Sequence, residues 1–121
     1  MKSKESSEYI KGTIKTIVLK LLTDHTKMYG YEITQKVKAL SGGEIELTYG
    51  ALYPILYKLE KDQLVISESE IVEGRVRKYY SLTRKGGEQA LQKVAELNKF
   101  IQVIYNVIGG SPQPTVPTWA I

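Results

Sequence analysis

The sequence lacks cysteine, and it contains a single histidine, His25, within a segment of turn-forming residues. Without cysteine there is no disulfide, no thiolate zinc site and no cysteine nucleophile. One histidine leaves no recognisable nucleophile–base pair or metal cluster, and the sequence has no glycine-rich phosphate loop. We therefore expect a protein that is not an enzyme and that needs no cofactor or metal.

Long apolar runs are also missing. Residues 1–8 are polar, contain no apolar core of a secretory signal and are expected to fray. No apolar stretch approaches the roughly 20 residues that a membrane-spanning helix requires. The expected location is the cytoplasm, with no membrane partner.

What the sequence does contain is typical of one folded domain. Of its 121 residues, 42% are hydrophobic and 25% are charged, which is enough apolar material for a core. The net charge of +4 and the pI near 9.2 suit a nucleic-acid partner. Many unrelated small proteins are equally basic, so the position of the charges matters more than their sum.

Three segments in the first half have helical periodicity. They span Tyr9–Thr23, Tyr31–Leu40 and Thr48–Lys61, and the hydroxyl of Thr48 suits an N-cap. Turn formers separate them, and Glu44–Leu47 alternates like a short extended segment. The predicted apolar stripes are Ile10, Ile14, Ile17, Val18 and Leu21 in the first helix, Ile33, Val37 and Leu40 in the second, and Leu52, Ile55, Leu56 and Leu59 in the third.

The second half changes period twice. Residues 64–69 and 77–82 are rich in β-branched and aromatic residues, which predicts a hairpin with its tip at 71–75. A last helix is predicted over 85–108, and residues 109–121 form a proline-rich tail that contains the only tryptophan, Trp119. The apolar residues of the last helix have the spacing of a coiled-coil seam, at Ala90, Val94, Leu97, Ile101, Ile104 and Ile108, with a second stripe at Phe100, Val103 and Val107.

This order of elements predicts a mainly α protein with a small β-hairpin, a winged helix-turn-helix followed by a long C-terminal dimerisation helix. We divide it into a DNA-binding domain (1–84), the dimerisation helix (85–108) and the tail (109–121). The third helix would be the recognition helix. Its face opposite the buried stripe carries Gly50, Pro54, Tyr57 and Lys61, with Ala51, Tyr53 and Lys58 on the flanks.

Cations also gather on the predicted wing. Arg75, Arg77 and Lys78 lie near its tip, where a wing would contact phosphates. The other arm is acidic, with Glu68, Glu70 and Glu73. Two plainer interpretations stay open at this point: the third helix is an ordinary surface helix, and the wing charges are a solvated run.

Three linked motifs resemble those of the PadR transcriptional regulators. Tyr29-Gly30-Tyr31-Glu32-Ile33 is similar to the family's Gly-Tyr-Glu-Ile signature. Gly50-Ala51-Leu52-Tyr53-Pro54 resembles its Gly-Thr-Leu-Tyr-Pro recognition motif. Residues 74–83, followed by Gly86 or Gly87, resemble the wing and the start of the last helix.

The resemblance implies a repressor that binds an inverted-repeat operator in double-stranded DNA as a homodimer, with a small-molecule inducer as a candidate partner. The DNA-binding residues it implies are Tyr31, Thr48, Tyr49, Gly50, Ala51, Tyr53, Pro54, Tyr57, Lys58, Lys61, Arg75, Arg77 and Lys78. The implied dimer interface, in which the last helix packs on the partner's first helix, comprises Ile10, Ile14, Ile17, Val94, Leu97, Ile101, Ile104 and Ile108. The alternative for the last helix is an intramolecular core.

Several positions depart from the family pattern. Ala51 replaces a threonine, Gln63 replaces the glycine of a typical Asp-Gly-Leu, and Tyr29 stands where histidine is common. Drug-sensing relatives carry a tryptophan where this chain has Leu97, so an aromatic-drug sandwich is not expected. A ligand pocket lined by Leu97, Phe100, Ile101 and Ile104 is an alternative to a close-packed core there. The alternative function is a winged helix that binds only protein.

Overall fold

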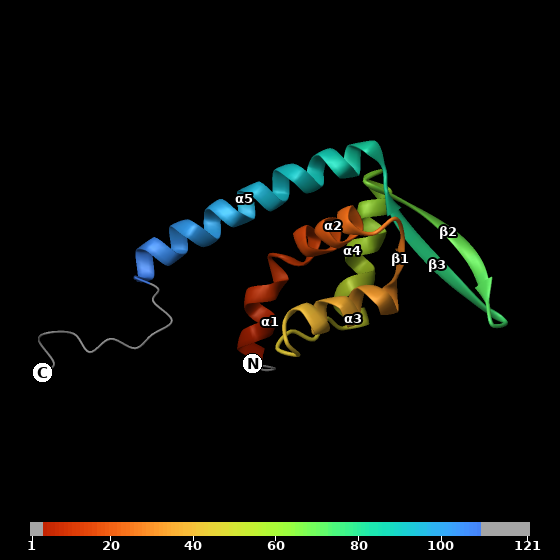
Figure 1. The fold of residues 1–121 in the computed structure, drawn as a ribbon, viewed down its shortest axis with the longest axis horizontal. Helices are drawn as coiled ribbons and strands as arrows, with labels where there is room; N and C mark the ends of the chain where they lie inside the picture. The colour runs from red at the N-terminus through yellow and green to blue at the C-terminus, as the bar shows by residue number, and fades with distance from the viewer. Residues whose placement is uncertain (1–3, 110–121) are drawn as a thin grey trace, which may run out of the picture.

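The computed structural model describes residues 4–109, and the predicted tail with Trp119 lies almost entirely outside that range. Five helices surround one end of a small antiparallel sheet, and two strands of the sheet project from the body as a wing (Figure 1). The elements are α1 (Lys4–Lys11), α2 (Ile14–Asp24), β1 (Met28–Tyr29), α3 (Gly30–Leu40), α4 (Tyr49–Lys61), β2 (Val65–Val72), β3 (Arg75–Leu82) and α5 (Arg84–Ile108). The predicted winged helix-turn-helix with a long last helix is confirmed.

The first predicted helix is in fact two helices. α1 begins at Lys4, within the segment expected to fray, and ends at Lys11. Thr13 then donates from its hydroxyl to the Ile10 carbonyl at 2.8 Å, and its backbone N–H bonds the same oxygen at 2.9 Å. Glycine at position 12 weakens a helix, and a threonine hydroxyl competes for helical carbonyls. The prediction of one continuous helix over Tyr9–Thr23 was therefore wrong.

The helix-turn-helix pair follows its local signals closely. The Glu32 carboxylate accepts from the Tyr29 backbone N–H at 3.1 Å at the start of α3. After Leu40, Gly42 and Gly43 adopt φ of 63° and 83°, and Gly43 donates to the Lys38 carbonyl at 2.8 Å. The extended segment expected at Glu44–Leu47 forms no strand. A strand forms instead at β1, in a segment predicted to be a turn.

The sheet has the order β1-β3-β2. Met28 pairs with Tyr80 of β3, and Val72 pairs with Arg75 across the tip of the wing. Glu73 and Gly74 at the tip have φ of 51° and 75°, and positive φ at both central residues is what a type I′ hairpin turn requires. The predicted hairpin is confirmed, and β1 anchors its base to the body.

The core lies between α2, α3, α4 and the base of the sheet. Most residues of the predicted stripes are buried in it, namely Ile14, Val18, Leu21, Ile33, Val37, Leu52, Leu56 and Leu59, and Leu19 and Val65 are buried with them. Leu40 is different: it is 71% exposed at the end of α3. Burying a large aliphatic side chain is worth about 1.5–3 kcal/mol, so this cluster holds the helices together.

α5 packs on the body only along its first half. The Thr83 hydroxyl accepts from the Gly86 backbone N–H at 3.0 Å, and Gly109 ends the helix with φ of 64°. Ala90 is buried and Val94 and Leu97 are half-buried, but every residue from Asn98 to Gly109 is exposed. The helix therefore extends away from the other elements (Figure 1). No described helix is long and apolar enough to cross a membrane.

Candidate nucleic-acid interface

α4 has one buried and one exposed face. The Thr48 hydroxyl caps it by accepting from the Ala51 N–H at 3.2 Å, as the sequence predicted. Leu52, Leu56 and Leu59 bury one side of the helix. The predicted recognition residues lie on the other side: Tyr49, Gly50, Tyr53, Pro54, Tyr57, Lys58 and Lys61 are exposed, and Ala51 is half-buried.

Tyr53 joins the two helices of the motif. Its ring lies 5.7 Å from that of Tyr49, centroid to centroid. Its hydroxyl sits against Gly30, where a Cβ would lie only 2.5 Å from that oxygen. Any larger residue at the start of α3 would therefore require the Tyr53 ring to move. Tyr31, one residue further along, is 52% exposed beside this contact.

The cations at the end of α4 are partly paired. Both lysines are exposed. Lys58 Nζ lies 3.4 Å from the Asp62 carboxylate. Glu60 accepts a hydrogen bond from the Ser67 hydroxyl, and Lys78 Nζ lies 3.4 Å from its carboxylate. The Ser67 hydroxyl and, next, the Lys78 charge lower the pKa of Glu60 below its ordinary value. The ionised carboxylate on the flank of α4 is therefore stabilised by Ser67 of β2 and paired with Lys78 of β3.

The three wing cations do not form one patch. Arg75 is exposed at the tip, while Lys78 is turned toward Glu60 and lies over the Tyr80 ring at 5.6 Å. Arg77 points to the other face of the wing, where its guanidinium lies 4.6 Å from the centre of the Tyr29 ring. A hydrogen bond with Tyr79 raises the pKa of Arg77 above its ordinary value. Successive side chains of a strand point to opposite faces, so Arg77 and Lys78 lie on different faces of the wing.

The structure contains a cluster of tyrosines and cations at the base of the wing that the sequence analysis did not predict. The Tyr29 ring contacts Tyr79 edge-on at 5.3 Å and stacks with Tyr31 at 6.3 Å. Lys27 lies 4.8 Å from the Tyr79 ring centre. Lys27 also pairs with Glu70 and, at 3.6 Å, with Glu68, and the Glu70 hydrogen bond raises the pKa of Lys27. The negative charge of β2 is thus partly neutralised by Lys27, which lies between α2 and β1.

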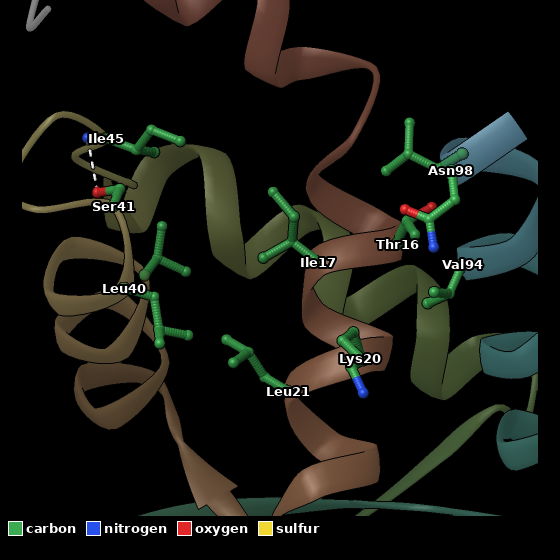
Figure 2. Close-up of a pocket in the computed structure, with 11 residues that line it drawn as sticks. Thr16, Ile17, Lys20, Leu21, Leu40, Ser41, Ile45, Val94 and Asn98 are labelled. Carbon is green, nitrogen blue, oxygen red and sulfur yellow. Dashed lines mark hydrogen bonds between the residues drawn. The ribbon is translucent and has the colours of Figure 1, made fainter. Parts of the chain in front are cut away.

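The predicted ligand pocket and the observed cavity share one residue. A cavity of about 490 Å³ lies between α2, the end of α3 and α5. Figure 2 shows Ile17 and Leu21 of α2 turned toward Leu40 and Ile45. Leu97 lines this cavity, but Phe100, Ile101 and Ile104 are exposed further along α5. The full lining is Thr16, Ile17, Lys20, Leu21, Val37, Leu40, Ser41, Ile45, Val94, Leu97 and Asn98.

The residues predicted at the dimer interface differ in exposure. Ile101, Ile104 and Ile108 are 55%, 40% and 73% exposed. Ile10, Ile17, Val94 and Leu97 are half-buried. Ile14 is only 4% exposed and belongs to the core, so the structure removes it from this set.

His25 has a local structural contact. It follows the end of α2, is half-buried, and its Nδ1 lies 2.8 Å from the Leu21 carbonyl oxygen. Among the side chains that the structure describes, residues 8–109, no group of three or more histidine, cysteine, aspartate or glutamate residues could hold a metal ion.

These features define a winged helix-turn-helix protein whose second motif helix, α4, presents an exposed face. The family model described as the transcriptional regulator PadR-like family matches residues 18–93. The chain belongs to this family of transcriptional regulators.

Individual relatives agree with this assignment. A transcriptional regulator from Mycobacterium tuberculosis is 33% identical over 79 residues, which cover 65% of this chain and 70% of the relative. The structure of a transcriptional regulator from Clostridium thermocellum has a TM-score of 0.74 at 29% identity, covering 82% of this chain and 96% of the other. A PadR family regulator from Eggerthella lenta has a TM-score of 0.69 at 29% identity, covering 88% and 87%.

Proposed function

We propose that this protein is a repressor that binds an inverted-repeat operator in duplex DNA as a homodimer. In each subunit α4 enters the major groove, and the wing tip with Arg75 contacts the adjacent backbone. The observation that carries the proposal is the exposed face of α4, which holds Lys58 and Lys61 while its one carboxylate, Glu60, is paired with Lys78. An unpaired carboxylate there would repel phosphates.

The homodimer is supported by the second half of α5. Its exposed apolar residues are Phe100, Ile101, Val103, Ile104, Val107 and Ile108. Large contiguous apolar patches of this kind mark interaction sites, since isolated soluble proteins rarely leave them in water. A second copy of α5 and its neighbours would cover the patch and place two α4 helices on one duplex.

A small-molecule inducer would bind in the cavity between α2, the end of α3 and α5 and release the protein from DNA. The cavity beside Leu97 touches both α5, which would hold the dimer, and α3, which supports α4. An apolar molecule bound there would shift α5, and with it the dimer contact, relative to α3 and α4.

The salt dependence of DNA binding tests the proposal. Fluorescence anisotropy of duplex fragments from the gene's own upstream region, at roughly 50 to 200 mM salt, should show affinity falling steeply because phosphate contacts release counterions. Lys61→Ala and Arg75→Ala should each weaken binding and, because a dimer carries two copies of the side chain, reduce the salt slope by about two. Lys99→Ala, which removes an equal charge from an exposed site on α5, is the matched control.

A winged helix that binds only protein gives the opposite result. It would show no salt-dependent affinity for any of these duplexes, and Lys61→Ala would then behave like Lys99→Ala.

A further inference from the structure

The base-facing half of α4 has an unusual set of side chains for a recognition helix. Residues 49–57 read Tyr-Gly-Ala-Leu-Tyr-Pro-Ile-Leu-Tyr and contain no Arg, Lys, Asn, Gln, Asp, Glu or His. Base edges are read mainly by the N-terminal residues of such a helix. The bidentate pairs that identify guanine and adenine need Arg, Lys, Asn or Gln. This half of the helix has none of them.

The two lysines of α4 do not supply the missing contacts. Lys58 and Lys61 lie in the last turn, and Lys58 is held by Asp62 at 3.4 Å. At that end of the helix a cation is placed to neutralise backbone phosphates, which position the protein but carry no sequence information.

The exposed surface of residues 49–57 is largely carbon. Tyr49, Tyr53 and Tyr57 are 48%, 46% and 70% exposed, and Pro54 is exposed as well. The Tyr53 hydroxyl is packed against Gly30 of α3, so its ring rather than its hydroxyl faces outward from the Tyr49–Tyr53 pair. Proline also brings no backbone N–H to the surface.

The major-groove edges present one apolar group, the C5-methyl of thymine. Carbon surface placed on any other edge would desolvate hydrogen-bonding groups without replacing their partners, which is costly. Resting on the proposed function, we infer that α4 recognises its operator through thymine methyl groups, which contact Tyr49, Tyr53 and Pro54. These three are the specificity-determining residues, and each half-site presents thymines at the centre of the contact.

Replacing thymine by deoxyuridine tests this without changing the protein. The operator is first selected from a pool of random duplexes, and each half-site thymine is then replaced in turn. Deoxyuridine keeps the pairing, the charge and every hydrogen-bonding group but removes the methyl. Affinity should fall about fourfold for each contacted thymine, the value of one buried methyl or methylene group. Deoxyuridine in the spacer between half-sites should have no effect. Deoxyuridine in place of the thymine that Tyr53 contacts should likewise have no effect on binding by the Tyr53→Ala variant, which lacks that contact.

A second arm separates ring contacts from hydroxyl contacts. Tyr49→Phe and Tyr53→Phe keep the rings, so both variants should keep the preference for thymine over deoxyuridine. If either variant abolishes specific binding while deoxyuridine is tolerated in the wild-type complex, hydroxyl groups read the bases and the inference is wrong.

The failures of the two proposals are distinguishable. Equal affinity for the thymine and deoxyuridine operators, with binding still steeply salt-dependent, overturns methyl recognition and leaves the repressor proposal standing. Absence of binding to any duplex overturns both.

Discussion

At the scale of single residues, two adjacent glycines at the start of α5 have different roles. A Cβ on Gly86 would lie 1.9 Å from the Leu64 carbonyl oxygen, whereas a Cβ on Gly87 would meet nothing within 4 Å. Gly86→Ala should therefore lower the free energy of unfolding by about 1–3 kcal/mol or more, because backbone must move. Gly87→Ala should be neutral or stabilising by up to about 1 kcal/mol. Urea unfolding of both variants checks this, and equal destabilisation would contradict it.

Gln63 carries local backbone strain. It follows α4 with φ of 62°, and the bonds Gln63 N–H to Glu60 O (3.0 Å) and Leu64 N–H to Leu59 O (2.9 Å) form a C-terminal cap. A glycine would adopt this conformation without the cost of about 1–2 kcal/mol that a Cβ adds.

We predict that Gln63→Gly raises the free energy of unfolding by about 0.5–1 kcal/mol, the strain relieved less the flexibility gained by the unfolded chain. Gln35→Gly, in the exposed middle of α3, is the control and should destabilise by about 1 kcal/mol. Thermal and urea unfolding of both variants measure the difference. Destabilisation by Gln63→Gly would show that the cap is not strained.

At the scale of elements, Glu60 connects α4 to the wing. The pKa of Glu60 is lowered in the folded state by the Ser67 hydroxyl and by Lys78, so folding favours the ionised form. The stability this contributes is present above the unfolded pKa and is lost as the pH falls through the lower pKa of the folded state.

Glu60→Gln should therefore reduce the loss of stability as the pH falls below the ordinary pKa of a glutamate, since a neutral amide has no proton to bind. The measurement is urea unfolding at several pH values for wild type and variant, with Glu88→Gln, an exposed glutamate near the start of α5, as control. If both variants keep the wild-type slope, the ion pair does not couple α4 to the wing.

The boundaries of the elements show which signals are local. The bounds of α3, α4 and α5 were predicted within one residue and those of the two hairpin strands within three, because glycine, threonine caps and apolar periodicity act within one segment. The α1–α2 break was missed because Gly12 and Thr13 lie within a continuous apolar stripe. β1 was missed because a strand of two residues, Met28–Tyr29, exists only through its pairing with β3.

At the scale of the whole molecule, the proposed dimer makes a prediction about α5. Ile101→Glu combined with Ile108→Glu should leave the fold of one chain intact, because both side chains are exposed in it. The same change should convert a dimer into a monomer, because it would bury unpaired carboxylates at the interface. Sedimentation equilibrium and circular dichroism measure the two effects.

The matched control is Lys99→Glu, which changes charge on the same helix at an exposed position outside the predicted interface. A wild-type protein that sediments as a monomer, or a double variant that remains a dimer, would contradict the prediction. Loss of helical signal in the double variant would instead place these residues in the core.

Local patterns were sufficient for the class of fold, the family motifs and the outward face of α4, because the residues concerned follow one another along one helix or turn. The pairing of the wing cations depends on contacts between distant segments: Arg77 reaches Tyr29 of β1, and Lys78 reaches Glu60 of α4. The same holds for the cavity beside Leu97 and for the burial of Ile14. The spacing of apolar residues predicts which face of a helix is buried, but only the tertiary packing determines which residues that face contacts.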